Sequence, residues 1–383
     1  MKIAFVTIYN PHDRVSRSGI IFSIYKQLER YNEVVWINPN NSILYKCGYF
    51  LFCVIMFIFK KIGYKITEHN PYMSKLIAIS LRKPIIEGGF DAIFMFAQID
   101  AVYMDYGIPI FVRTDAIFNS AIDYYWYGFP KWFIRQANSL EERALDKIAC
   151  LFATSQWIKD EVKKYHPNRR YNNIKVVLSG ANMDDGYIKW NAKKYDKNMP
   201  IRMLFVGYDL KRKGFDIAYD TMRIIKKEYH REVTLTVIGG KPSEEQLDDT
   251  NLIYIGRMDK NKKEEHDKFY GEFSKANIFI FPTKAEFSAI VNCEAAAYAL
   301  PIFTYNVGGT SSYVIDKYNG RIFETSAGSD IYASSIIEAI DSGKMEYYSR
   351  NSRKQYEEVL NWNHWGNVVH DYIHEYKEIL MKE

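Results

Sequence analysis

Short apolar runs alternate with amphipathic stretches along most of this chain. Apolar runs of four to eight residues indicate buried strands, whereas apolar residues spaced three or four apart indicate helices. This alternation predicts an α/β fold built on parallel sheets. Helices are expected at 20–28, at 133–146 and after Ser155, which suits a helix N-cap. In the first half, strands are expected at residues 2–8, 33–38, 91–96, 108–112, 148–154 and 174–178.

A polar stretch separates the two halves. Residues 184–199 are rich in Lys and Asn, lack apolar periodicity and end at Pro200. The alternation then resumes, and near the end of the chain the stretch 362–380 has one apolar stripe typical of a helix. We therefore predict domains at residues 1–190 and 200–360, followed by a helical segment, 361–383. In the second half, strands are expected at 203–207, 233–240, 252–258, 278–281 and 302–305.

Composition adds only broad limits. A chain of 383 residues is long enough for two cores. The net charge of +5 is compatible with an anionic substrate or membrane surface but demonstrates neither. The N-terminus reads as a strand and not as a signal peptide. Four cysteines without paired metal spacing are expected to be reduced, buried thiols, which indicates the cytoplasm; they are Cys47, Cys53, Cys150 and Cys293.

One segment is unusually apolar. Residues 49–59 contain no polar interruption, end in Lys60 and Lys61, and are followed by Lys65. Eleven residues are too few to span a bilayer, which needs about 20. Two structures fit the segment: a buried core helix, or a helix on the inner face of the plasma membrane with its lysines at anionic headgroups.

The stretch 281–301 carries the most informative chemistry. Glu286 lies in a loop after an apolar strand, and a small-residue helix is expected to begin near Ser288, carry Glu294 and stop at Pro301. A helix N-terminus offers unpaired N–H groups to an anion. An activated sugar has matching parts, because its diphosphate suits the helix end and its hydroxyl-rich rings suit the carboxylates. The alternative is a buried Ala-rich helix whose Glu side chains face solvent.

A second candidate segment follows the first strand of the second half. Gly207 is followed by three adjacent cations, Lys211, Arg212 and Lys213, and then by Gly214. Fixed cations at this place would stabilise the charge that develops on a diphosphate leaving group. A solvated basic turn is the alternative.

Residues 200–325 resemble the C-terminal domain of retaining nucleotide-sugar glycosyltransferases of the glycogen-synthase-like type (glycosyltransferase group 1, family 4). The resemblance implies the GT-B fold: two Rossmann-like doubly wound domains, a cleft between them and a C-terminal helix crossing back. It implies a nucleotide-diphosphate sugar donor, with UDP as the expected nucleotide, bound by the second domain. The acceptor would be a saccharide or lipid-linked saccharide, bound by the first domain. No cofactor, catalytic metal or nucleic-acid partner is expected.

The resemblance also assigns catalytic roles. Lys213 matches the family's Lys before Gly, but the family's Arg, which directly follows the first Gly, is replaced by Tyr208. Arg212 is the candidate replacement. Glu286 would contact the transferred sugar. Asp115 occupies the place of a family His or Asp facing that sugar, with Arg113 as a weaker candidate in the same loop; an Asp that caps a turn is the alternative.

Donor binding is assigned in the same way. Glu294 would accept hydrogen bonds from the ribose, and backbone N–H groups near Ser288 would hold the phosphate. At glycines such as Gly19, the backbone would be able to approach the donor and acceptor closely. A glycine that simply precedes the start of a helix is an equally good explanation of Gly19. Aromatic residues 124–127 are expected to pack in the core or to stack on sugars. The full donor-binding set is Gly19, Gly207, Arg212, Lys213, Gly239, Ile255, Phe287, Ser288, Ala289, Ile290 and Glu294.

Two other functions share the predicted fold. A UDP-sugar 2-epimerase needs more acid and base side chains than the sequence offers. A non-catalytic nucleotide-sugar-binding subunit is compatible with Tyr208 in place of the family's Arg. The acidic pairs 184–185 and 248–249 do not resemble an Asp-x-Asp metal motif. The sequence leaves open the donor sugar, the acceptor, the linkage and the oligomeric state.

Overall fold

The computed structural model of the chain describes residues 1–167, 171–183, 188, 190 and 193–380. These residues form two compact units. Unit 1 comprises Met1–Ser16, Ile20–Val177 and Val368–Glu383, and unit 2 comprises Arg17–Gly19 and Leu178–Asn367. The expected linker, 184–199, falls within unit 2, and part of it, including the acidic pair 184–185, lies outside the described residues.

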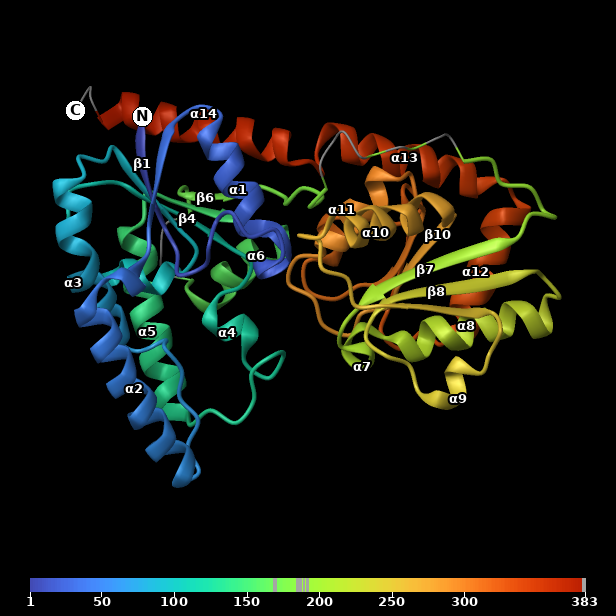
Figure 1. The fold of residues 1–383 in the computed structure, drawn as a ribbon, viewed down its shortest axis with the longest axis horizontal. Helices are drawn as coiled ribbons and strands as arrows, with labels where there is room; N and C mark the ends of the chain where they lie inside the picture. Colours follow the sequence, from blue (N-terminus) through green and yellow to red (C-terminus); the bar gives the residue numbers. More distant parts are fainter. Residues whose placement is uncertain (168–170, 184–187, 189, 191–192, 381–383) are drawn as a thin grey trace. The chain divides into compact units, whose positions relative to one another are not determined.

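Unit 1 is built on one parallel sheet, which has six strands over the described residues (Figure 1). All six strands expected in this half are confirmed, most of them one to three residues shorter than predicted. The strand order is β2-β1-β3-β4-β5-β6. The strands are β1 (Lys2–Val6), β2 (Glu33–Ile37), β3 (Ala92–Met95), β4 (Ile110–Thr114), β5 (Cys150–Ala153) and β6 (Ile174–Val176).

The helices of unit 1 include two that the hydrophobic pattern located well. α1 spans Ile20–Glu29 and α5 spans Lys131–Lys147. The Ser155 hydroxyl caps α6 by accepting from the Ile158 N–H at 3.3 Å, as expected. The other helices of this half are α2 (Ile43–Lys61), α3 (Pro71–Glu87), α4 (Phe118–Ala121) and α6 (Gln156–Tyr165).

The C-terminal helix α14 spans Trp362–Leu380, the extent predicted from its stripe. Its residues from Val368 onward belong to unit 1. The Tyr372 ring packs edge-on against Phe152 at 5.8 Å, and Tyr376 packs in the same way against Phe111 at 5.5 Å. An ion pair between Lys377 and Asp91, at 2.9 Å, fixes the end of the helix. This part of α14 therefore covers the aromatic side chains of the unit 1 sheet.

Unit 2 contains a second parallel sheet, also of six strands within the described part of the chain. Its order, β12-β11-β10-β7-β8-β9, is that of a Rossmann fold, with the chain reversing direction across the sheet between β7 and β10. In such sheets, ligands bind outside the carboxyl ends of the strands at this reversal point. The strands are β7 (Ile201–Gly207), β8 (Val233–Gly239), β9 (Leu252–Gly256), β10 (Ile278–Phe281), β11 (Ile302–Tyr305) and β12 (Gly320–Phe323).

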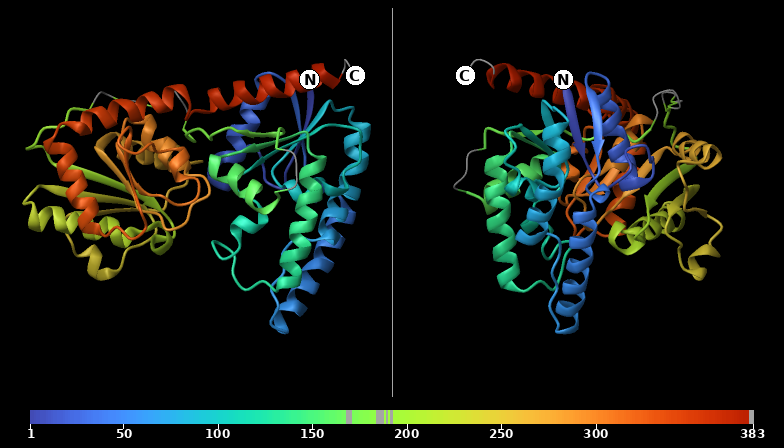
Figure 2. Two further views of the ribbon diagram at one scale, coloured as in Figure 1. Left: turned by 180° about the vertical axis from the view of Figure 1, so that it is seen from behind. Right: turned by 60° about the vertical axis from the view of Figure 1, so that its left-hand side comes forward.

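Helices cover both faces of the unit 2 sheet (Figures 1 and 2). Successive side chains of a strand point to opposite faces, so Met203 and Phe205 join one hydrophobic cluster and Leu204 joins the other. The strand residues in both clusters are buried, which explains why the strands read as largely continuous apolar runs. The helices are α7 (Leu210–Lys213), α8 (Phe215–Glu228), α9 (Glu244–Leu247), α10 (Lys263–Lys275), α11 (Ile290–Ala297), α12 (Ser329–Asp341) and α13 (Lys344–Glu358).

The structure corrects two expectations in unit 1. The apolar segment 49–59 is part of a longer helix, α2. By length and composition this helix could cross a membrane, and only 11% of its 18-residue apolar window is buried. The helix is therefore longer than the 11 apolar residues of the segment. It is also not a buried core helix, because most of it is exposed. Cys47, on this helix, is exposed, and Cys53 is only partly buried, so the expectation of four buried thiols was also wrong.

Candidate functional site

The loops after β7 and β10 meet at the reversal point of the unit 2 sheet. The Lys284 N–H donates to the Arg212 carbonyl at 2.8 Å, which joins the two loops directly. Gly214 permits this approach: a Cβ atom there would lie 1.9 Å from the Pro282 carbonyl oxygen, and its φ of +73° favours glycine. The two segments that the sequence marked as chemically informative are thus adjacent.

The short helix α7 directs the basic side chains. Asp209 caps it by accepting from the Arg212 N–H at 3.1 Å, and Asp209 also pairs with the Arg212 Nε at 3.3 Å. One terminal nitrogen of the Arg212 guanidinium donates to the Ala285 carbonyl at 3.0 Å. Arg212 is therefore held between its own turn and the loop after β10.

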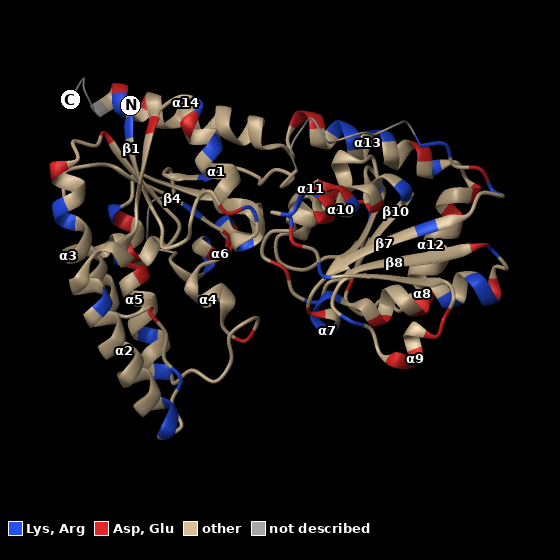
Figure 3. Ribbon diagram, viewed as in Figure 1, with Lys and Arg blue, Asp and Glu red and all other residues tan. Residues whose placement is uncertain are grey.

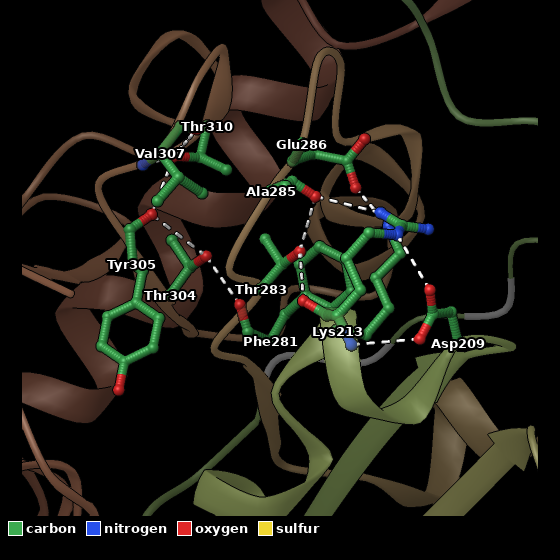
Figure 4. Close-up of polar contacts among 11 residues, drawn as sticks. Asp209, Lys213, Phe281, Thr283, Ala285, Glu286, Thr304, Tyr305, Val307 and Thr310 are labelled. Atoms are coloured by element: carbon green, nitrogen blue, oxygen red, sulfur yellow. Dashed lines mark hydrogen bonds and ion pairs between the residues drawn. The ribbon is translucent and has the colours of Figure 1, made fainter. Parts of the chain in front are cut away.

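Lys213 and Glu286 form an ion pair across the two loops (Figure 4). Both side chains are largely buried, at 15% and 11% exposure. The Lys213 ammonium also lies 4.8 Å from the centre of the Phe281 ring, a cation–π contact. The structure thus brings three of the four predicted catalytic residues together: Arg212, Lys213 and Glu286.

The loop after β11 supports Glu286 from the other side. The Gly309 N–H donates to the Glu286 carbonyl at 3.2 Å. The Thr310 hydroxyl closes this loop by contacting the carbonyls of Tyr305 and Val307 at 2.8 and 2.9 Å, as Figure 4 shows. Loops that follow three neighbouring strands, β7, β10 and β11, therefore hold the Glu286 position.

The loop that carries Glu286 leads directly into α11. The helix begins at Ile290, slightly later than the predicted start near Ser288, and no side-chain hydrogen bond caps it within the described residues. The Ile290 N–H donates to the Ser288 carbonyl at 3.0 Å. The helix ends at Ala297 and not at Pro301, because Ala299 adopts a φ of +56°. Phe287, Ser288 and Ala289 form the short link between Glu286 and this helix.

Glu294 has a partner that sequence reasoning missed. Its carboxylate, which is 5% exposed, pairs with the Lys260 ammonium at 2.7 Å. Lys260 comes from the loop after β9 and lies 4.1 Å from the Phe269 ring centre. In the sequence it is one of several lysines in the polar stretch 259–263, and nothing there distinguishes it from a solvated lysine. Burial, with a smaller contribution from the charge of the adjacent Glu294, raises the pKa of the Cys293 thiol well above its usual value.

The predicted glycines lie at strand ends of the same sheet. Gly207 and Gly239 pair in register at the ends of β7 and β8. A Cβ on Gly239 would lie 2.4 Å from the Gly207 carbonyl oxygen, so tight packing alone explains glycine at that position. Ile255 is partly buried near the end of β9. Just beyond that strand, the Arg257 guanidinium lies 5.0 Å from the ring of Tyr208, which is 60% exposed.

Asp115 and Gly19 belong to other parts of the chain. Asp115 follows β4 in unit 1, and its carboxylate, 46% exposed, lies 3.9 Å from the buried Arg113 guanidinium. Gly19 ends the 3-10 helix Ser16–Gly19 with a φ of +85°. Of the aromatic run, Trp126 packs against Phe118 at 5.7 Å, whereas Tyr127 is 59% exposed. Among the described residues, no group of three or more His, Cys, Asp or Glu side chains could hold a metal ion.

Comparisons with known proteins show what the chain is similar to. Residues 187–355 match the family model described as glycosyl transferases group 1. An uncharacterized 41.2 kDa protein of the cps region of Klebsiella pneumoniae is 24% identical over 214 residues, 54% of this chain and 55% of that protein. The capsular polysaccharide biosynthesis glycosyltransferase CapM of Staphylococcus aureus is 26% identical over 177 residues, 45% of this chain and 46% of CapM. The chain thus spans about half the length of these two relatives.

Among solved structures, the Anabaena protein HepE in complex with UDP and glucose is similar over 98% of this chain and 100% of its own. The TM-score is 0.65 and the sequence identity is 14%, a likeness of fold. The chain has the GT-B fold, and its residues 187–355 match the model of the glycosyl transferases group 1 family.

Proposed function

We propose that this protein is a retaining glycosyltransferase that uses a nucleotide-diphosphate sugar as its donor. The observation that carries the proposal is the meeting of Arg212, Lys213 and Glu286 at the reversal point of the unit 2 sheet. Glu286, the partner of Lys213, precedes the first residue of α11, Ile290, by four residues. An anionic ligand fits such a place, because cations and helix N–H groups both favour negative charge.

Donor binding would exchange one set of ion pairs for another. In the structure, Lys213 is paired with Glu286, and Glu294 is paired with Lys260. A diphosphate would compete with Glu286 for Lys213, and the ribose hydroxyls would compete with Lys260 for Glu294. Glu286, once released, would accept hydrogen bonds from the transferred sugar. The two pairs give each of these buried carboxylates a charged partner.

The chemical step would then depend on charge stabilisation. The bond between the sugar C1 and the phosphate oxygen breaks, and negative charge develops on the leaving diphosphate, which Arg212, Lys213 and the α11 N–H groups would stabilise. The acceptor hydroxyl attacks C1 on the face that the diphosphate leaves, and its proton passes to an oxygen of that diphosphate. We propose Asp115 as the carboxylate that stabilises positive charge on the sugar ring.

Two further parts of the proposal come from the comparisons. HepE was solved with UDP and glucose, which supports UDP as the first nucleotide to test. CapM is named for capsular polysaccharide biosynthesis, and the Klebsiella protein for its cps region. We therefore propose a saccharide or lipid-linked saccharide acceptor in the synthesis of a capsular or other cell-envelope glycan.

The proposal is tested by incubating the protein with UDP-, GDP-, ADP- and dTDP-sugars and identifying the products by NMR. A retaining transferase releases the nucleoside diphosphate and gives a product with the anomeric configuration of the donor. An inverted anomer would contradict the retaining mechanism. A changed sugar still attached to its nucleotide would indicate an epimerase. Binding without turnover, tested over a panel of saccharide acceptors, would indicate a non-catalytic subunit.

A further inference from the structure

Helix α2 exposes an apolar stripe on its outer side. Its exposed large side chains recur at spacings of three, four and seven residues, which places them on one face of a helix. Surface helices of globular proteins normally direct such a stripe inward, and a contiguous exposed apolar face marks an interaction site. The stripe consists of Ile43, Leu44, Phe50, Leu51, Val54, Phe57 and Ile58.

The opposite face of α2 is anchored to α3. Tyr72 of α3 stacks on the buried Phe52, and its hydroxyl donates to the Gly48 carbonyl at 3.0 Å. Gly48 lies so close to Leu76 that a Cβ atom there would be 2.6 Å from a Leu76 methyl group. α3 in turn contributes to the core of unit 1. The orientation of the stripe is therefore fixed outward, and α2 could not cross a bilayer without leaving α3.

The charged side chains of α2 itself, and of the residues just after it, have one sign, and the nearest acidic side chain is that of Glu68, which contacts Tyr49 of α2 at 3.5 Å. Between residues 43 and 67 the charged side chains are Lys46, Lys60, Lys61 and Lys65, and there is no Asp or Glu. Lys46, Lys60 and Lys61 are exposed. Figure 3 shows α2 almost free of charge along its length, with basic residues at its lower end. Such a distribution complements anionic lipid headgroups. It disfavours pairing between two copies of the stripe, because the charges that α2 itself carries would be alike.

Aromatic side chains surround the C-terminal end of α2. Phe59 contacts Tyr64 at 6.5 Å and Trp132, at the start of α5, at 6.1 Å. Tyr64, Trp132 and the nearby Tyr127 are 46%, 42% and 59% exposed. Tyr and Trp are enriched where a protein passes from lipid to water. In Figure 2 this end of α2 extends beyond the sheet of unit 1.

We propose that α2 docks unit 1 onto an anionic lipid surface. The helix lies in the plane of the interface, with its stripe at the boundary of the acyl chains and with Lys60 and Lys61 among the headgroups. The contact is peripheral, because α3 holds the other face of the helix. The proposal is independent of the transfer reaction and is tested without a donor.

The test is co-sedimentation of the full chain with vesicles of phosphatidylcholine containing 30% phosphatidylglycerol. Phe50→Ser with Phe57→Ser should weaken binding at least about 10-fold by removing apolar area. Lys60→Gln with Lys61→Gln should weaken it about 30-fold in low salt and much less in high salt. All four side chains are exposed, so the variants should keep the wild-type melting temperature.

Matched controls lie in unit 2. Lys226→Gln with Lys227→Gln removes two adjacent exposed lysines from the last turn of α8, and Ile331→Ser removes an exposed apolar side chain from α12. Both controls should bind vesicles like the wild type. Equal losses in the controls and the α2 variants would overturn the proposal. The proposal would also be overturned if the wild-type protein did not bind these vesicles but formed a dimer, and if Phe50→Ser with Phe57→Ser dissociated that dimer.

The position of α2 in the bilayer can be read at Cys47, which is exposed on the outer side of the helix. An environment-sensitive fluorophore on Cys47, in a Cys53→Ser background, should shift to the blue when vesicles are added. Quenchers near the headgroups should quench it more than quenchers at the bilayer centre. Strongest quenching at the centre, which indicates a spanning helix, would overturn the interfacial placement.

Discussion

At the scale of single residues, the candidate donor site is held by two lysine–carboxylate pairs. Lys213–Glu286 and Lys260–Glu294 are both largely buried. Removing one partner of such a pair leaves the other charge desolvated, which is more damaging than removing both. The effects of single substitutions here therefore depend on which partner remains and on whether a ligand can replace the lost one.

The Glu294 pair gives the first prediction. Glu294→Ala should weaken UDP binding by about 1–3 kcal/mol, because the ribose loses a charged acceptor. Lys260→Ala should leave UDP affinity unchanged or increase it, because the ribose no longer competes with the ammonium. Titration calorimetry with UDP measures both. A Lys260→Ala variant that binds UDP as weakly as Glu294→Ala would show that Lys260 itself contacts the nucleotide.

The basic turn gives the second prediction. Lys213→Ala should lower turnover by roughly 100-fold or more, because leaving-group charge loses its cation. Arg212→Ala should have a similar effect if Arg212 replaces the family's Arg, whose place Tyr208 occupies. Lys211→Ala is the matched control, since this lysine lies in the same turn and is exposed. Steady-state kinetics should separate the control from the other two; three equal rates would contradict a phosphate-binding role.

A partly buried carboxyl in unit 1 gives the third prediction. Burial, with a smaller contribution from the charge of Glu68, raises the pKa of Asp100 from 3.8 to about 7. The folded protein therefore holds this proton more tightly than the unfolded chain, and stability falls as pH rises between about 4 and 7. Melting temperatures from pH 5 to 8 should fall less steeply for Asp100→Asn than for the wild type. Parallel curves would contradict the shifted pKa.

The sequence was informative about the residues of the site but not about their partners. Lys213, Arg212 and Glu286 could be selected because they sit next to strand ends with glycine or proline beside them, and parallel strands bring such ends together. Lys260 could not be selected, because its role depends on a contact with Glu294, which lies 34 residues further along the chain. Its neighbours in the sequence are equally basic and polar.

At the scale of elements, the junction between α7 and α8 controls the site. Gly214→Ala should strongly destabilise the protein, because the new Cβ would clash with Pro282 as well as strain a backbone with a φ of +73°. Gly343→Ala is a control with the same φ but open space around its Cβ position. The control should cost about 1–2 kcal/mol of unfolding free energy, and Gly214→Ala should cost more. Equal losses in denaturant titrations would contradict the close approach of the two loops.

There is a physical reason why some elements were predicted and others were missed. Buried parallel strands form short apolar runs, so their positions were evident. α3 was not predicted, since it begins at Pro71 and contains Pro84, and prolines usually mark helix ends. α2 was underestimated because Lys46 and Gly48 interrupt its apolar pattern. Which of its faces would be exposed depends on its packing against α3, and the pattern alone left that open.

At the scale of the whole molecule, a donor that binds unit 2 should leave a localised signature. Hydrogen exchange with saturating UDP should show slower exchange in residues 207–216 and 282–294, where the loops and the α11 N-terminus would be ordered by the ligand. Exchange in α2 should not change. The measurement compares the full chain with and without UDP. Protection confined to unit 1, or none in these two segments at saturation, would contradict the proposed donor site.

The discontinuity of unit 1 has a consequence for how the protein is made. A ribosome delivers the chain from the N-terminus, so the strands of unit 1 emerge first, while residues 368–380, which cover Phe111 and Phe152, emerge after all of unit 2. The later-made unit can therefore complete its core while the earlier-made one still exposes aromatic surface. Exposed apolar surface of this kind is what holdase chaperones bind and what leads to aggregation. The N-terminal half of this protein is thus the part that matures last.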